Sequence, residues 1–316
     1  MGKLTVIGII WLLLFAATLI VIDEQLSANK ALQPSNGAQK PQDPEVPDTS
    51  GFVALHIDGC LIDDFWERGG NDLPVLNVAL NYTVSNTGNI SANIVIVEIS
   101  VDSVYHSTET INQLMPNSEI VATAFFSVDY DQTRIVKIEA SYKNLTNSWN
   151  YTIDAKLPRH PYWSMSKLFI TPNEQNLQST YEEIMSGVVF VHWITIRDWV
   201  GRSIEYTKDE DVYGVDEYWQ LARETLESRR GDCEDLAILL CSLLRADGWN
   251  AQDVYVVIGQ NKAGDYHAWV KIKIPLVGWY NIDPQLEGWY TLFGDFVSLH
   301  GYEAICNFND QFFIEL

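Results

Sequence analysis

Cysteine is scarce in this chain, and its scarcity narrows what the protein can be. The 316 residues contain four Cys, at positions 60, 233, 241 and 306. They are too few and too scattered for a disulfide scaffold or a zinc cluster. Cys233 and Cys241 lie on one predicted helix, about 12 Å apart by helical rise, which is too far for a disulfide. A bridge from Cys306 to Cys60 or to Cys241 stays open.

Basic residues are also few. The chain has 20 Lys and Arg against 42 Asp and Glu, which gives a formal net charge of −22. This excess argues against nucleic acid and anionic membrane surfaces as partners, because both repel a negative protein. Aromatic residues are plentiful, with 11 Trp, 15 Tyr and 12 Phe. Such a content is typical of folded cores and excludes a disordered chain.

Long apolar runs are absent except at the start. Residues 4–22 carry no charge and are long enough to cross a bilayer. Lys3 precedes the run while Asp23 and Glu24 follow it, so the positive-inside rule puts the N-terminus in the cytoplasm. A cleaved signal peptide is the alternative, but the run is long for one and no Ala-x-Ala site ends it. We therefore predict a single-pass anchor at residues 1–23 in the cell membrane, with the bulk of the chain outside the cytoplasm.

The next two segments differ sharply in composition. Residues 24–50 contain four prolines among polar residues, so they predict a Pro-rich polar linker that buries no core. Residues 51–157 predict an immunoglobulin-like β-sandwich domain of six or seven short strands. The alternation of apolar and polar residues is clearest in five runs: 75–84, 94–99, 120–128, 135–142 and 149–153. No catalytic constellation is evident in this domain.

Residues 158–316 mix helical and strand patterns. Residues 177–206 carry apolar side chains in a mostly helical register, of which residues 202–206 predict a short extended piece. Residues 208–211 form an acidic segment that we expect to be a solvated turn. Residues 254–258 predict a buried strand, and residues 266–274 and 278–282 predict half-buried strands.

The stretch Gly231-Asp232-Cys233-Glu234-Asp235 begins a strongly apolar helix. Asp232 is a good N-cap residue, five leucines follow at helical spacing, and Gly248 marks the end. Cys233 therefore lies in the first turn, where free N–H groups and the helix dipole favour a thiolate. Burial as a small core residue is the alternative role for Cys233.

The two acids after Cys233 need a separate interpretation. A carboxylate aimed at the thiol would raise its pKa. Because helix neighbours point in different directions, we expect Glu234 and Asp235 to interact with the helix dipole or with Arg229 and Arg230 instead.

Two downstream motifs supply partners for a thiol nucleophile. His267 lies in Tyr266-His267-Ala268-Trp269-Val270, and Asp283 ends Gly278-Trp279-Tyr280-Asn281-Ile282-Asp283-Pro284. The imidazole can accept the thiol proton, and the carboxylate can hold the imidazole in the right tautomer. His300 is a second imidazole, but no such context surrounds it, so His267 is the candidate base.

With these three motifs in this order, residues 160–300 resemble the transglutaminase-like superfamily of papain-type thiol enzymes. The resemblance implies that residues 158–316 form a transglutaminase-like domain in which a helix packs on an antiparallel sheet. The fold class predicted for the whole chain is α+β, with this domain preceded by the β-sandwich and the transmembrane helix. The implied catalytic residues are Cys233, His267 and Asp283.

The resemblance also suggests two substrate-binding residues. The family commonly has an aromatic residue upstream of its Cys loop, so Trp219 is a candidate for lining the cleft; a place in the core is its equal alternative. Trp269 shares a strand face with His267, and we expect it to restrict the imidazole ring and shield the cleft from water. No metal and no organic cofactor is implied.

The implied reaction is acyl transfer through an acyl-Cys233 intermediate on a protein or peptide substrate outside the cytoplasm. Transfer to water would make the protein a cysteine peptidase or amidase, and transfer to an amine would make it a cross-linking transglutaminase. Hydrolysis is favoured because water is the default acceptor. A non-catalytic cell-surface binding or structural module is the alternative from another class, and the intact triad argues against it. The substrate and the oligomeric state stay open.

Overall fold

A computed structural model describes residues 50–160, 163–285 and 301–316. The predicted transmembrane helix, nearly all of the linker and His300 lie outside these ranges. Among the residues described, no helix combines the length and the apolar character that crossing a bilayer requires.

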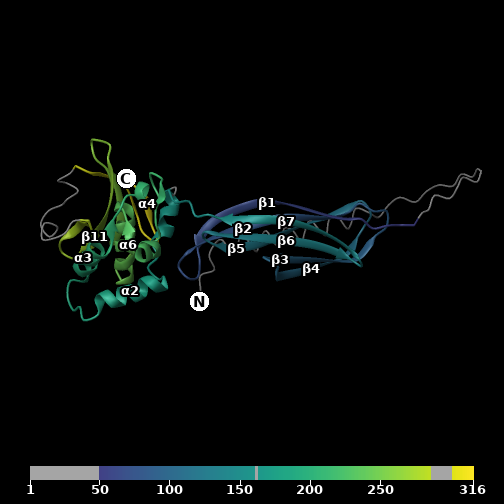
Figure 1. The fold of residues 1–316 in the computed structure, drawn as a ribbon, viewed down its shortest axis with the longest axis horizontal. Helices are drawn as coiled ribbons and strands as arrows, with labels where there is room; N and C mark the ends of the chain where they lie inside the picture. Colours follow the sequence, from purple (N-terminus) through teal and green to yellow (C-terminus); the bar gives the residue numbers. More distant parts are fainter. Residues whose placement is uncertain (1–49, 161–162, 286–300) are drawn as a thin grey trace, which may run out of the picture. The chain divides into compact units, whose positions relative to one another are not determined.

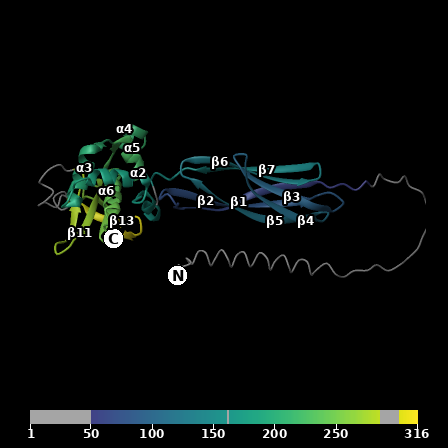
Figure 2. The same ribbon diagram turned by 90° about the horizontal axis from the view of Figure 1, so that it is seen from below.

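Seven antiparallel strands occupy residues 55–155 and form two sheets. Figures 1 and 2 show these strands running along one another. One sheet has the order β1-β2-β5 and the other has the order β4-β3-β6-β7. The strands are β1 (Leu55–Arg68), β2 (Pro74–Asn86), β3 (Ala92–Val101), β4 (Val104–Leu114), β5 (Ser118–Asp129), β6 (Gln132–Tyr142) and β7 (Leu145–Ala155).

The inward-facing residues of both sheets form one apolar core, as a β-sandwich requires. Leu80 and Val84 of β2 are fully buried together with Val95 of β3 and Ile138 of β6. Strand β2 alternates between buried and partly buried positions except at Ala79, which is buried between Val78 and Leu80.

The sequence pattern missed strands β1 and β4, and both lie at a sheet edge. Most of their residues are exposed, so their apolar and polar positions do not alternate clearly. An edge strand is held by backbone hydrogen bonds to a single neighbour and needs few buried side chains. Hydrophobic periodicity gave no signal for these two strands, although it did find β5 and β7, which also lie at sheet edges.

The remaining residues form helices packed on a five-stranded antiparallel sheet. The sheet order is β12-β11-β10-β13-β14, and a separate parallel pair joins β8 to β9. The helices are η1 (Trp163–Phe169), α2 (Gln175–Met185), α3 (His192–Ser203), α4 (Asp209–Tyr213), α5 (Ala222–Ser228) and α6 (Cys233–Ala246). The strands are β8 (Glu205–Tyr206), β9 (Arg230–Gly231), β10 (Val254–Gln260), β11 (Tyr266–Ile274), β12 (Gly278–Ile282), β13 (Glu303–Phe308) and β14 (Phe313–Glu315).

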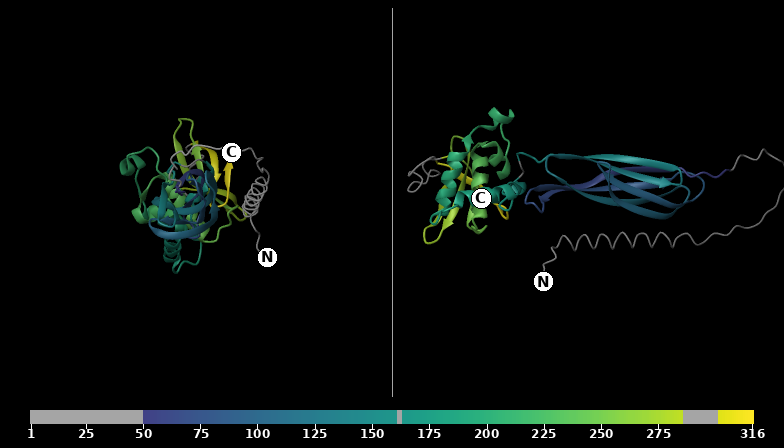
Figure 3. Two further views of the ribbon diagram at one scale, coloured as in Figure 1. Left: turned by 90° about the vertical axis from the view of Figure 1, so that its right-hand side faces the viewer. Right: turned by 60° about the horizontal axis from the view of Figure 1, so that its bottom comes forward.

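Helix α6 lies at the centre of this second core. Residues 236–244 are at most 1% exposed, so the helix is buried on every side along these turns. Strands β10 and β11 contact it, and so do helices α2, α3 and α5; the green helix lies beside the yellow-green strands in Figure 3. The apolar helix predicted after Cys233 is confirmed.

Two expectations for the segment before α6 were wrong. The helical part of residues 177–206 is not one helix, because a left-handed glycine, Gly187 with φ of 80°, separates α2 from α3. The extended piece predicted at residues 202–206 is present as strand β8. The acidic segment 208–211 is not a solvated turn. It enters helix α4, and Asp209 is only 2% exposed.

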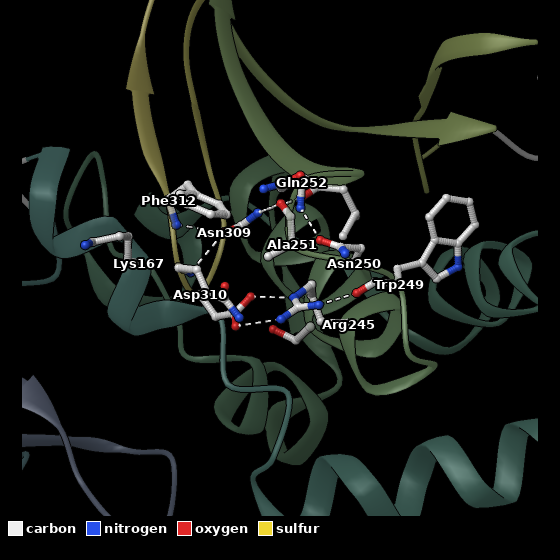
Figure 4. Close-up of polar contacts among 12 residues, drawn as sticks. Lys167, Arg245, Trp249, Asn250, Ala251, Gln252, Asn309, Asp310 and Phe312 are labelled. Carbon is white, nitrogen blue, oxygen red and sulfur yellow. Dashed lines mark hydrogen bonds and ion pairs between the residues drawn. The ribbon is translucent and has the colours of Figure 1, made fainter. Parts of the chain in front are cut away.

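Polar contacts fix the C-terminal end of α6 to the turn between β13 and β14 (Figure 4). The guanidinium group of Arg245 pairs with both carboxylate oxygens of Asp310, at 2.6 and 3.0 Å. Its third contact is the carbonyl oxygen of Trp249. The side-chain amide of Asn309 donates to the carbonyl oxygens of Ala251 and Val254, the latter at 2.9 Å. These contacts join the C-terminal end of α6 and the segment that follows it to the turn between β13 and β14.

All four cysteines are free thiols, so neither disulfide left open by the sequence is formed. Cys241 and Cys306 are buried and Cys60 is exposed.

Replacing a buried leucine of α6 tests how much this core contributes to the stability of the protein. Leu239→Ala is expected to lower the free energy of unfolding by about 2–5 kcal/mol, because it leaves a cavity in close-packed surroundings. Urea unfolding followed by circular dichroism measures the loss. Leu145→Ala is the matched control, since Leu145 is 44% exposed and the same truncation there should cost under about 0.5 kcal/mol. Equal losses at the two positions would contradict a core centred on α6.

Candidate active site

The candidate nucleophile is held by the burial of its helix. Cys233 is the first residue of α6 and is partly buried. The backbone N–H of Ala268 on strand β11 acts on this thiol and lowers its pKa, which partly offsets the effects that raise it. Because α6 packs against β11, the thiol lies beside the strand that carries His267.

The candidate base and its orienting carboxylate come from neighbouring strands. His267 lies on β11 and Asp283 directly follows β12, which pairs with β11 through Val270 and Ile282. The distance from His267 Nε2 to Asp283 Oδ2 is 2.7 Å. Both side chains are buried, at 8% and 4% exposed. A carboxylate only accepts, so the Nε2 atom carries a proton and the Nδ1 atom is left as the basic nitrogen.

Charges near the thiol differ from what the sequence suggested. The Glu234 carboxylate does not point away from Cys233: its Oε2 atom lies 3.2 Å from the sulfur and accepts a hydrogen bond from the thiol. Burial raises the pKa of the Cys233 thiol, and the charges of Glu234 and Asp232 raise it further. The expected thiolate is therefore disfavoured in the free protein, because burial and the two acids outweigh the helix terminus.

Asp235 also differs from expectation, because it does not interact with Arg229 or Arg230. Its Oδ1 atom accepts from the backbone N–H of Gln220 at 2.7 Å, and its Oδ2 atom accepts from the Gln220 amide at 2.6 Å. Oδ2 also accepts from the backbone N–H of Asp232 at 3.3 Å. A side chain at Gly231 would collide with Asp235, so only glycine fits there. Asp235 thus fixes the entry into α6.

Comparison with known proteins agrees with this arrangement. Residues 192–284, which include all three candidate catalytic residues, match the model of the transglutaminase-like superfamily. These residues form a transglutaminase-like domain. No curated protein matches the chain.

Among solved structures, the chain is similar to LapG of Legionella pneumophila, with 14% identity and a TM-score of 0.35 over 50% of this chain and 90% of that one. It is also similar to a candidate cysteine protease of Cytophaga hutchinsonii, with 13% identity and a TM-score of 0.34 over 79% and 83%. The CARDB domain of PF1109 from Pyrococcus furiosus matches with 14% identity and a TM-score of 0.27 over 34% and 96%.

Aromatic rings enclose the imidazole of the transglutaminase-like domain. Trp269 lies on the same face of β11 as His267, with ring centres 6.2 Å apart and planes inclined by 25°. The Tyr302 ring lies 5.2 Å from that of His267. The Trp269 indole donates to the Asn281 side-chain oxygen at 3.0 Å, which fixes the indole in its plane. These contacts are the structural basis for the packing role that we expect of Trp269.

Trp219 lies in the domain core. It is 8% exposed, stacks on Phe308 at 5.6 Å and meets the edge of Phe169 at 5.8 Å. These contacts favour the core alternative for Trp219 over a place lining the cleft.

Sequence reasoning did not find Tyr206, although it lies next to the nucleophile loop. Tyr206 on β8 pairs with Gly231 on β9, two residues before Cys233. Burial raises the pKa of its phenol, and the charges of Cys233, Asp232, Glu234 and Asp283 add to the rise. The pairing of two-residue strands leaves no periodic signal, so no pattern in the sequence points to Tyr206.

Gly259 on β10 is the residue that lets Trp269 reach the imidazole. A Cβ atom there would lie 2.5 Å from the Trp269 ring and 2.6 Å from the Glu303 carbonyl oxygen. Gly259→Ala is expected to displace the indole, lower the free energy of unfolding by about 1–3 kcal/mol and slow alkylation of Cys233. Thermal unfolding and the rate of iodoacetamide labelling measure the two effects. Gly70→Ala, where no atom lies within 4 Å, is the control and should change neither.

Proposed function

We propose that the transglutaminase-like domain is a thiol enzyme that acts on amide or peptide bonds through an acyl-Cys233 intermediate, and that it works as a cysteine peptidase or amidase. One observation carries the proposal. Helix α6, which begins with Cys233, packs against strand β11, which carries His267, and His267 is hydrogen-bonded to Asp283 at 2.7 Å. Thiol acyl transfer needs a thiol, an imidazole that accepts its proton and a carboxylate that orients the imidazole.

Each residue has a defined part in the reaction. The Cys233 sulfur attacks the amide carbonyl carbon while its proton passes to Nδ1 of His267. Asp283 stabilises the imidazolium that results. The imidazolium then protonates the leaving amine as the C–N bond breaks, which leaves a thioester on Cys233.

Water completes the cycle. His267 takes a proton from water as the oxygen attacks the thioester. The imidazolium then protonates the sulfur as the C–S bond breaks, which releases the carboxylic acid and restores the Cys233 thiol. An amine in place of water would give transamidation, as in a cross-linking transglutaminase. The backbone N–H of Cys233, at the start of α6, is one donor to the oxyanion in either case.

The raised pKa of Cys233 bears on the timing of proton transfer. Because burial and the neighbouring acids raise the pKa of the thiol, the proposed mechanism has His267 act as a general base during attack, without a thiolate formed beforehand. Loss of the imidazole therefore removes the step that creates the nucleophile.

Cleavage of a peptide library by the full chain, read by mass spectrometry, tests the function. Wild-type protein is expected to cleave peptide bonds, and Cys233→Ala and His267→Ala are expected to lower the rate by about 10³-fold or more. Asp283→Asn should leave the fold intact and lower the rate strongly, because the imidazole loses its fixed tautomer. Cys60→Ala, which removes an exposed thiol far along the chain from the site, should cleave as wild type does.

The outcomes separate the candidate functions. Hydroxylamine added to the same reaction turns acyl-enzyme into hydroxamate, so hydroxamate in excess of hydrolysis products would favour the transglutaminase. Cleavage that persists in Cys233→Ala would overturn the thiol mechanism. If no peptide is cleaved and no acyl-Cys233 forms with any of them, the domain is a non-catalytic module.

We also propose that residues 4–22 anchor the enzyme in the cell membrane and that it meets protein or peptide substrates outside the cytoplasm. The uncharged length of the segment and the charges that flank it support this location. The protein is expected to stay with membranes in alkaline carbonate and to be digested by protease added to intact cells. Deletion of residues 1–23 should release it. Recovery of the undeleted chain in the soluble fraction would contradict the anchor.

A further inference from the structure

Four asparagines open an Asn-x-Ser/Thr triplet, and all four lie in the β-sandwich: Asn81, Asn89, Asn144 and Asn150. None of the asparagines in residues 158–316 opens such a triplet. The triplet is the acceptor sequence for N-linked sugars, which secreted proteins carry on their surfaces. Because a triplet this short also arises by chance, the exposure of each asparagine decides whether it can serve as an acceptor.

Asn144 lies at the tip of the hairpin that joins β6 to β7. Tyr142 pairs with Leu145 across the hairpin, so Lys143 and Asn144 form a two-residue turn. Lys143 has a positive φ of 51°, which is typical of tight hairpin turns. Asn144 is exposed, and so are Leu145 and Thr146, which complete its triplet. The whole triplet is therefore open to solvent.

Asn150 lies on the outer face of β7. Its neighbours Trp149 and Tyr151 pack against the core of the sandwich, and successive side chains of a strand point to opposite faces. Asn150 therefore points away from the core, and it is exposed. Thr152, the third residue of the triplet, lies on the same face and is exposed as well.

The other two asparagines are held by hydrogen bonds. Asn81 is partly buried on β2, the central strand of its sheet, and its Oδ1 atom accepts from the hydroxyl of Thr123 at 2.6 Å. Asn89 is exposed, but its Oδ1 atom accepts from the backbone N–H of Phe52 at 2.8 Å. Both side chains are thus fixed against the protein, which makes them poor acceptors.

We propose that Asn144 and Asn150 carry N-linked oligosaccharides, a modification that rests on the proposed location outside the cytoplasm. The donor is an oligosaccharide joined to a lipid through a diphosphate. The amide nitrogen of the asparagine forms a bond to the first carbon of the sugar while the bond from that carbon to the diphosphate breaks. The lipid diphosphate leaves, and a base of the transferase takes one proton from the amide.

Two exposed apolar side chains lie beside the proposed sites. Leu145, which follows Asn144, is 44% exposed, and Ile135 on β6 is 52% exposed. Ile135 pairs with Thr152, which shares the outer face of β7 with Asn150. A bulky hydrophilic sugar at each site would shield these side chains from other proteins, so the modification should keep the sandwich soluble.

Mass spectrometry of the full chain, purified from the membranes of the cells that produce it naturally, tests the proposal. Trypsin cleaves after Lys143 and Lys156, so the single peptide 144–156 contains both asparagines. This peptide is expected to carry two oligosaccharides, each attached through an asparagine nitrogen. The peptide 69–134, which contains the two fixed asparagines, is expected to carry none.

Substitutions in the triplets locate the sugars. Thr146→Ala is expected to remove the sugar from Asn144 only, and Thr152→Ala from Asn150 only, because each change destroys one triplet and leaves its asparagine in place. Ser148→Ala is the matched control. Ser148 is exposed on the same strand between the two triplets but belongs to neither, so both sugars should remain.

Three results would overturn the proposal: an unmodified peptide 144–156 in the chain from membranes, sugar on peptide 69–134 alone, or sugar on peptide 144–156 that persists when Thr146→Ala and Thr152→Ala are combined. The last result would place the sugar on a hydroxyl group. An unmodified peptide from a chain that protease reaches only after the cells are broken would overturn the proposed location too. The combined variant should cleave peptides as wild type does, so the sugars and the thiol mechanism succeed or fail separately.

Discussion

The burial of helix α6 is the constraint on which the candidate site depends. Its apolar middle can only be satisfied between the sheet and the other helices, and that position leaves its first residue against β11. Cys233 is thereby brought to the strand of His267, while the pairing of β11 with β12 brings Asp283 to the imidazole. Packing and strand register, which involve no catalytic chemistry, together assemble the three groups that acyl transfer requires.

The charges around Cys233 do not favour the thiolate that the simplest account of an activated thiol requires. A helix N-terminus favours a thiolate, yet burial and the charges of Glu234 and Asp232 raise the pKa of Cys233. The acids are placed by the same helix start that places the nucleophile, so they cannot be removed from its neighbourhood without moving it. A nucleophile made during attack by His267 answers this conflict between charge and position.

Hydrophobic pattern was a good guide where a segment buries one face and a poor one elsewhere. It found α6 and β11, whose apolar residues face a core, and it found β2, β3, β5, β6 and β7 of the sandwich. It missed the edge strands β1 and β4, most of whose residues are exposed. It also assigned the acidic segment at Asp209 to solvent, although the chain folds that side chain inward. Local charge does not reveal what a distant segment covers.

The sequence by itself determined the three catalytic candidates, their order and the elements that carry them, because each lies in a short motif whose local structure is set by nearby residues. Only the tertiary structure decided which neighbours act on them. No local pattern encodes four features of the site. They are the turn of Glu234 toward the thiol, the place of Trp219 in the core, the approach of Tyr206 through β8, and the proximity of Asp209 to the start of α6. Such contacts arise when the helices close over the sheet, and their energies depend on burial that exists only in the folded chain.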